Sequence, residues 1–402
     1  MHRVYMDANA TTPLLPEVME AMRPWFDEQF GNASSIHFHG QRARAAVDHA
    51  RESVAALLGC RAAEIVFTSG GTEGDNLALF GMLLNNGGIK PGDHLIISSV
   101  EHSAVLHSAD RLRDRGVDVT LLPVSHAGVV DPEDVRRALR PTTRLISVMM
   151  ANNETGVLQP VVEIGAIARE ARVPFHTDAV QAVAKVPLDV KAIGCDLLTI
   201  SGHKLHAPQG TGALYIRRGT QIEPLLFGGT HERQRRAGTE NLPGIVGLGK
   251  AAEVALRGLA EGVPAKIGAL RDRLQSEILA SVDEAGVNGG DVPRVANTTN
   301  IWFDHVEAEA LVIALDLKGL AVSGGSACQS GATEPSPVLK AMGLPEDRAR
   351  ASIRFSLMKT TTVEDVDFAV ALVPQAVARL RELSPVYNSR KLAAISNGER
   401  VL

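Results

Sequence analysis

The chain has 402 residues, long enough to bury a large core and to form two lobes, and it carries a formal net charge of −5. This acidic balance argues against a nucleic-acid-binding surface, and no apolar run is long enough to span a membrane. The three cysteines are too sparse for a disulfide framework or a zinc site, and the first residues lack the apolar stretch of a signal peptide, so we expect a cytoplasmic protein.

Short apolar runs alternate with helical patterns through the first two thirds of the chain. Such alternation is typical of a mostly parallel sheet that is covered by helices on both faces, so we predict an α/β fold. The predicted strands are residues 64–68, 94–98, 117–122, 145–149, 173–177, 196–200 and 213–216, and the predicted helices are residues 71–84, 103–115, 132–139 and 162–171.

The pattern changes after about Gly258. A long helix is predicted over residues 265–284, then a strand over 297–303, a helix over 307–317, a Gly/Ser-rich loop, a strand over 353–356 and a helix over 362–383. This order is typical of a smaller α+β lobe. We therefore expect a large domain over residues 15–257 and a small domain made of residues 1–14 and 258–402.

Polar side chains follow five successive strands at the point where each strand ends. Taken singly they have ordinary explanations, because His102 and Asp178 are common residues at a helix start. The carboxyl ends of parallel strands meet at one edge of a sheet, however, so we expect these groups to lie together and to bind a ligand. The segments are Thr68–Glu73, Ser99–His102, Met150–Gly156, His176–Gln181 and Ser201–Lys204.

The chemistry of these groups matches that of one cofactor. A glycine turn that opens a helix, as at Gly71, suits a phosphate. A lysine such as Lys204 can form a Schiff base with pyridoxal 5'-phosphate, a carboxylate such as Asp178 can hold the pyridine nitrogen protonated, and a ring such as His102 can cover its face. The sequence therefore predicts a pyridoxal-phosphate site.

The chain also resembles a known family over nearly its whole length. It is similar to the cysteine desulfurases of the NifS/IscS type, a branch of the fold-type-I, class-V-aminotransferase-like pyridoxal-phosphate enzymes. This resemblance implies a large domain with a mostly parallel seven-stranded sheet and a smaller α+β domain. The motifs that carry it are Tyr5–Thr12, Gly31–Ser35, Thr68–Asn76, Glu101-His102, Asn152–Gly156, Asp178–Gln181, Ser201–Lys204, Arg236–Asn241 and Gly325–Cys328.

The resemblance implies a role for each matching residue. Lys204 would carry the cofactor and move protons, His102 would stack on the ring and help in proton transfer, and Cys328 would be the nucleophile. The other implied contacts are Asp178 to the pyridine nitrogen, Gln181 to the ring hydroxyl, Asn153 to cofactor and substrate, Arg354 to the substrate carboxylate, and Gly71, Thr72, Ser201, His203 and, from the second subunit of a homodimer, Thr239 to the phosphate.

The implied reaction converts L-cysteine to L-alanine and leaves a persulfide on Cys328, which passes its sulfur to an iron–sulfur scaffold or another acceptor protein. No resident metal is expected, although Cys328 could ligate an iron–sulfur cluster transiently. The pathway stays open between nitrogenase maturation, general iron–sulfur assembly and tRNA thiolation. The alternatives are a selenocysteine lyase or another pyridoxal-phosphate elimination or aminotransferase-type enzyme, and a catalytically idle cofactor-binding protein. We interpret Cys60 and Cys195 as structural thiols.

Overall fold

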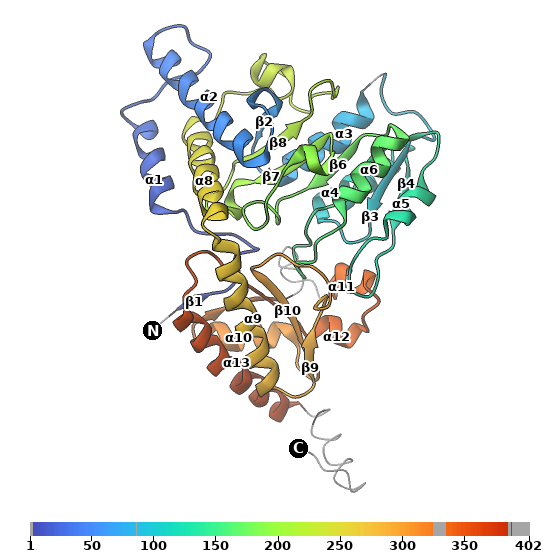
Figure 1. Cartoon of the computed structure of the whole chain (residues 1–402), viewed down its shortest axis with the longest axis vertical. Helices are drawn as coiled ribbons and strands as arrows, with labels where there is room; N and C mark the ends of the chain where they lie inside the picture. The colour runs from blue at the N-terminus through green and yellow to red at the C-terminus, as the bar shows by residue number, and fades with distance from the viewer. Residues whose placement is uncertain (1–2, 86, 325–334, 385–386, 388–402) are drawn as a thin grey trace, which may run out of the picture.

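The computed structural model describes residues 3–85, 87–324, 335–384 and 387, and Figure 1 shows two lobes, one above the other. The larger lobe is built on a seven-stranded sheet, as predicted. Only β8 is antiparallel to its neighbours, so the sheet is mostly parallel. The strand order is β2 (Ile65–Thr68), β8 (Gly212–Ile216), β7 (Leu197–Ser201), β6 (Phe175–Asp178), β5 (Thr143–Ser147), β3 (His94–Ser98) and β4 (Asp118–Leu122).

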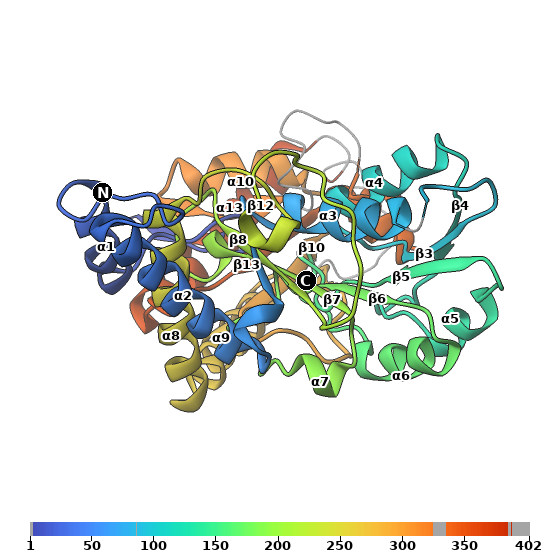
Figure 2. The ribbon, with the colours of Figure 1, turned by 90° about the horizontal axis from the view of Figure 1, so that it is seen from above.

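Alternate residues of the central strands face opposite layers of helices, as the period of two requires. Ile96 belongs to one apolar core and its neighbours Leu95 and Ile97 to another. Figure 2 shows the two layers on either side of the sheet. One layer contains α3 (Gly71–Leu84) and α4 (Ser103–Arg113), and the other contains α2 (Phe38–Leu58), α5 (Pro132–Ala138), α6 (Val161–Ala171), α7 (Val190–Ile193) and α8 (Leu242–Ala260).

The smaller lobe has a separate antiparallel sheet and a separate apolar core. Val4 and Met6 from the N-terminal segment pack in this core, and β1 (Val4–Tyr5) pairs in parallel with β11 (Leu320–Ala321). The sheet has the order β12 (Ser323–Gly324), β13 (Ser352–Ser356), β10 (Thr298–Phe303) and β9 (Ala285–Val287). The helices of this lobe are α9 (Val263–Ser281), α10 (Ala308–Asp316), α11 (Pro337–Ala341), α12 (Glu346–Arg350) and α13 (Val363–Leu383).

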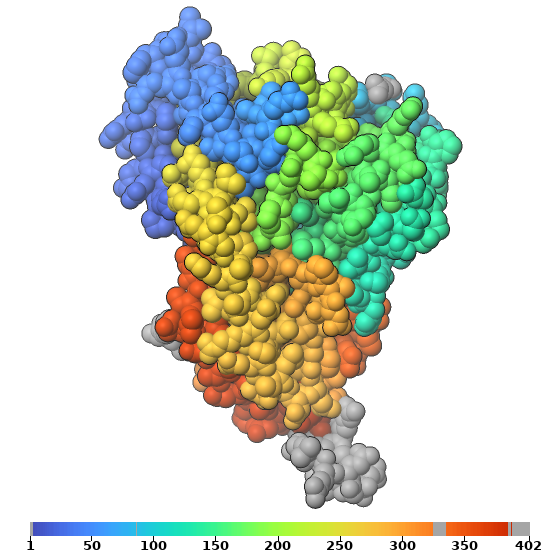
Figure 3. All heavy atoms as spheres, in the orientation of Figure 1, coloured from blue at the N-terminus to red at the C-terminus, as the bar shows by residue number. Residues whose placement is uncertain are grey.

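Two helices connect the lobes. Helix α8 packs on the large lobe, and α9, which follows it after two intervening residues, packs on the small lobe (Figures 1 and 3). Gly262 lies between them with a φ of 72°, a left-handed conformation that glycine adopts without a Cβ clash. None of the described helices is both long and apolar enough to cross a bilayer.

The predicted boundaries hold best where a turn and an apolar run coincide. Helix α3 and strand β3 begin and end at the predicted residues. The strand predicted at 145–149 is observed at Thr143–Ser147, because Val148 and Met149 are buried in the loop that follows it. The elements not predicted are α1 (Pro16–Met22), η1 (Arg23–Phe26), α2, η2 (Ala62–Glu64), α7, η3 (Gly202–Lys204), η4 (His231–Gln234), α8, α11, α12, β1, β9, β11 and β12.

Candidate active site

The N-terminus of α3 forms a narrow cradle beside Ser201, the last residue of β7. A Cβ on Gly71 would lie 2.9 Å from Val180 Cγ2 and 3.5 Å from Ser201 Cβ, so the backbone approaches this place more closely than a side chain would allow. The first N–H groups of a helix have no partner within the helix, and they attract anions. Gly71 and Ser201 are therefore brought together as a phosphate site requires.

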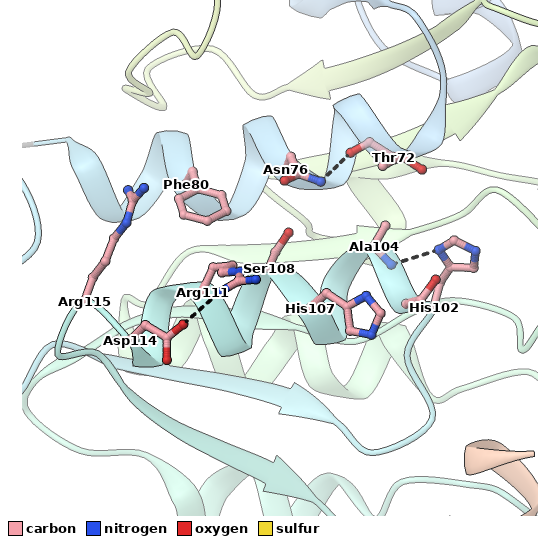
Figure 4. A pocket seen from close by; sticks show the side chains of 11 residues that line it. Thr72, Asn76, Phe80, His102, Ala104, His107, Ser108, Arg111, Asp114 and Arg115 are labelled. Atoms are coloured by element: carbon pink, nitrogen blue, oxygen red, sulfur yellow. Dashed lines mark hydrogen bonds and ion pairs between the residues drawn. The ribbon is translucent and has the colours of Figure 1, made fainter. Parts of the chain in front are cut away.

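Thr72 and His102 lie on opposite walls of a groove of about 570 Å³ between α3 and α4 (Figure 4). His102 caps α4, and its Nδ1 accepts a hydrogen bond of 3.1 Å from the N–H of Ala104. Because Nδ1 accepts this bond, the ring proton of a neutral His102 is on Nε2. The cap thus fixes both the orientation and the tautomer of the ring.

Asp178 ends β6 and is buried near the His102 ring and the Lys204 amine. Its Oδ1 accepts a 2.8 Å hydrogen bond from the N–H of Val180. Burial raises the pKa of Asp178, and the charges of His102 and Lys204 oppose this increase. A buried carboxylate in such a position is stabilised by a cationic ligand, and a protonated pyridine nitrogen is one.

Lys204 ends the short helix η3 and reaches the N-terminal segment. Its Nζ donates hydrogen bonds to the main-chain oxygens of Asn9, at 2.6 Å, and Ala10, at 2.7 Å. Gln181 Nε2 donates to the same Asn9 oxygen at 3.0 Å. Lys204 and Gln181, two predicted site residues from different loops, are therefore neighbours at the Asn9 carbonyl. No role for Asn9 was predicted from the sequence.

His203 lies beside Lys204 but is held by the N-terminal segment. Its Nδ1 is 3.1 Å from Thr11 Oγ1, and its main-chain oxygen accepts a 2.8 Å bond from Thr12 Oγ1. Burial, and then the charge of Lys204, lower the pKa of His203 to about 4. The ring is therefore neutral near pH 7, and Nε2 is the atom with which it could bind a phosphate.

Arg354 is buried and suited to bind a carboxylate, and the half-buried Asn153 lies beside it. Arg354 is 2% exposed on β13; it donates to the main-chain oxygen of Asn153 at 2.9 Å and to Asp7 Oδ1 at 2.7 Å. Arg354 Nε and Asn153 Oδ1 are buried without a hydrogen-bond partner among the described residues. Buried polar groups are usually paired, so these orphaned atoms indicate a missing ligand.

Three further groups beneath the site are neutral near pH 7 or close to it. Burial raises the pKa of Glu101 to about 8 and that of Glu154 to about 7, and it lowers the pKa of His176 to about 3. Glu101 therefore adds little negative charge near Asp178, and Arg354 has Asp7 as its anionic partner. None of these three residues was predicted as a site residue, although each of them stands within one of the predicted strand-end segments.

Two predicted residues are not placed at this site by the structure. Thr239 is exposed on the segment after η4. Cys328 lies outside the described residues. Within the described ranges, no group of three or more His, Cys, Asp or Glu side chains could hold a metal ion.

The residues that are brought together fit pyridoxal 5'-phosphate. The glycine cradle at α3 suits its phosphate, His102 and Asp178 suit its ring, and Lys204 suits its aldehyde.

A family profile, sequence relatives and solved structures all relate the chain to the same group of proteins. A profile of the aminotransferase class-V family matches residues 4–368. The chain is 49% identical to the cysteine desulfurase IscS of Methanosarcina thermophila, over 95% of this chain and 94% of the relative. A solved NifS-like protein superimposes with a TM-score of 0.85 at 34% identity, covering 94% of this chain and 99% of that one. The structure of SspA in complex with cysteine superimposes with a TM-score of 0.77 at 35% identity, covering 89% and 100%.

Proposed function

Because the chain belongs to the class-V aminotransferase family, in its cysteine desulfurase branch, and uses pyridoxal 5'-phosphate, we propose that it converts L-cysteine to L-alanine and transfers the sulfur to Cys328. The observation that carries this proposal is the convergence of Lys204 and a buried, incompletely paired Arg354 on the N-terminal segment at Asp7–Ala10. The first suits an aldehyde cofactor and the second an amino-acid carboxylate.

The cofactor, when bound, withdraws electrons from the bonds at the substrate α-carbon. The side chains supply the rest. Arg354 and Asn153 bind the substrate carboxylate, and a guanidinium does so with two parallel hydrogen bonds. Lys204 holds the cofactor and moves the proton at the α-carbon, while His102 covers the ring.

The remaining binding roles follow the same geometry. Asp178 would hold the ring nitrogen protonated, and Gln181 would bind the ring hydroxyl. Gly71, Thr72, Ser201 and His203 bind the phosphate. In a homodimer Thr239 reaches the phosphate of the partner subunit, which accords with its exposure in the single chain.

The sulfur step needs a thiolate, and two of the three cysteines are poor candidates. Burial raises the pKa of Cys60 to about 12, and that of Cys195 further still, so both stay protonated at neutral pH. We assign the attack to Cys328. The carbon–sulfur bond of the substrate breaks, an S–S bond forms on Cys328, and the protons of the two thiols are conserved in the persulfide and in the methyl group of alanine.

The test measures alanine and sulfide from L-cysteine with a thiol reductant. The wild-type holoenzyme should release both, Cys328→Ser should keep the visible absorbance of the cofactor but form no alanine, and Cys60→Ala and Cys195→Ala should stay active. A cofactor-loaded wild-type protein that forms no alanine, or a Cys328→Ser variant that forms it at the normal rate, contradicts the proposal.

The exposed apolar side chains support a homodimer. Six large apolar side chains are 63–91% exposed, and all of them except Leu317 lie within residues 26–38 or at residue 227. We propose that a second copy covers those at residues 26–38 and 227 and places Thr239 at the neighbouring site. Sedimentation at micromolar concentration should give twice the chain mass, and a monomer would refute this arrangement. The side chains are Phe26, Phe30, Ile36, Phe38 and Phe227.

For the acceptor of the sulfur we propose an iron–sulfur scaffold protein, on the support of relatives named IscS. Supply to nitrogenase maturation and a cytoplasmic location stay predictions. The second is supported by Cys60 and Cys195, which are both free thiols.

A further inference from the structure

Lys185 lies one turn beyond Gln181 and donates two hydrogen bonds to side-chain amide oxygens. Its Nζ is 2.6 Å from Gln181 Oε1 and 3.0 Å from Asn9 Oδ1. The chain bends sharply just before it, because Ala184 has a φ of 63°, a left-handed conformation that residues with a Cβ disfavour. The bend directs the Lys185 side chain back toward Gln181.

These bonds determine which way the Gln181 amide points. The main-chain oxygen of Asn9 can only accept, so the amide atom that faces it must be the nitrogen, and the amide oxygen then faces the Lys185 amine, which donates to it. The Asn9 oxygen also accepts from Lys204 Nζ, so the Gln181 N–H₂ group and the Lys204 amine share one acceptor and are neighbours.

We propose that Lys185 is a positioning residue: it fixes the Gln181 amide so that an N–H, and not the carbonyl oxygen, faces the cofactor held by Lys204. The proposal deepens the proposed function and rests on its cofactor assignment. An N–H of Gln181 held in this direction would stabilise an anionic phenolic oxygen on the cofactor. If the amide could rotate, its carbonyl oxygen would face that phenolic oxygen part of the time and repel it.

A lysine is a costly residue for this place unless its donors are needed. Lys185 is half-buried beside a narrow cavity of about 70 Å³ that Lys204 also lines. Burial lowers the pKa of Lys185 well below its usual range, and the charges of Lys204 and Arg354 lower it further. An apolar side chain would avoid this cost, but it would leave the Gln181 oxygen without a donor.

The test compares Lys185→Met, which keeps the length but has no donor, with Lys185→Arg, which keeps the donors. Cofactor-free protein is titrated with pyridoxal 5'-phosphate, and the dissociation constant and the visible spectrum are recorded. We expect Lys185→Met to weaken binding roughly tenfold or more and to change the pH dependence of the spectrum, and Lys185→Arg to stay within about threefold of wild type. Lys191→Met, an exposed lysine on α7, is the matched control.

Two comparisons decide whether Lys185 acts through Gln181. In a Gln181→Ala background, Lys185→Met should change the dissociation constant by less than about threefold, because the amide that it positions is gone. Equal effects in both backgrounds overturn the proposal. Gln181→Glu keeps an acceptor for Lys185 but removes the amide N–H, so it should weaken binding as much as Lys185→Met does, and wild-type affinity in this variant also overturns the proposal.

The outcomes separate this proposal from the proposed function. A wild-type protein that binds the cofactor but forms no alanine refutes the desulfurase activity and leaves the affinity comparison valid. A wild-type protein that binds no pyridoxal phosphate refutes both.

Discussion

The stability of the Glu101→Gln variant relative to wild type should increase as the pH rises from acidic to alkaline. Glu101 is buried; its Oε1 accepts from Ser98 Oγ at 2.5 Å and from the N–H of Met149 at 2.7 Å, while Oε2 has no partner among the described residues. Glutamine keeps an oxygen for both donors and cannot ionise. The substitution therefore removes a titration and leaves the hydrogen bonds.

The sign and size follow from the pKa of Glu101. Burial raises it from 4.5 to about 8, so the folded protein holds a proton that the unfolded chain has already lost. Stability is greatest below pH 4.5 and is lost as the pH rises through 8. Each pH unit between the two values costs about 1.4 kcal/mol, which gives about 4 kcal/mol between about pH 5 and about pH 8.5. The Glu101→Gln variant does not lose this stability, because glutamine does not ionise.

Thermal unfolding of the two proteins across this pH range measures the effect. For a domain of this size, Tm shifts by about 2 °C for each kcal/mol of stability. At the alkaline end of the range, the Tm of Glu101→Gln should therefore have risen by about 8 °C relative to that of wild type. Glu52→Gln, an exposed carboxyl on α2, should show no such widening. A Tm difference that is independent of pH would show that Glu101 is ionised in the folded protein, and the reasoning would be wrong.

Three further results are expected. Lys204→Ala should yield no covalent cofactor adduct by mass spectrometry after borohydride reduction, whereas wild type yields one; an adduct in the variant would exclude Lys204 as the attachment site. Arg354→Lys should raise the KM for cysteine about tenfold or more without changing the cofactor spectrum, because lysine cannot form the paired hydrogen bonds; an unchanged KM would move the carboxylate site elsewhere. Arg51→Leu should cost about 3–5 kcal/mol in denaturant unfolding, since it leaves the buried Glu232, paired at 2.7 Å through both oxygens, without its cation, and adding Glu232→Leu should restore part of that loss.

Much of the large sheet was predictable because its strands are buried on both faces and read as short apolar runs between turns. Helix α2 was missed for the opposite reason. Its buried side is made largely of Ala43, Val47 and Ala50, with the buried Arg51 among them, so the apolar stripe has the right spacing but little hydrophobic contrast. The apolar periodicity of α2 is present in the sequence, but its many alanines make it hard to recognise.

The predicted site residues came from strand ends and from motif similarity, and both signals are local in the sequence. Asn9 and Lys185 escaped for a physical reason. Their contacts join segments about 170 residues apart, and a half-buried lysine looks like any surface lysine until its acceptors are placed. The orphaned atoms of Asn153 and Arg354 likewise exist only in three dimensions.

The N-terminal segment explains why this chemistry needs two lobes. Met6 packs in the core of the small lobe, and the next residue, Asp7, pairs with Arg354. Two residues later the Asn9 oxygen accepts from Lys204, and Thr12 Oγ1 then donates to the main chain at His203. One short segment, with a turn at residues 8–10, therefore contacts both the substrate-binding arginine of the small lobe and the cofactor lysine of the large lobe. A movement between the lobes that displaced residues 7–12 would therefore change the position of Arg354 and that of Lys204 together.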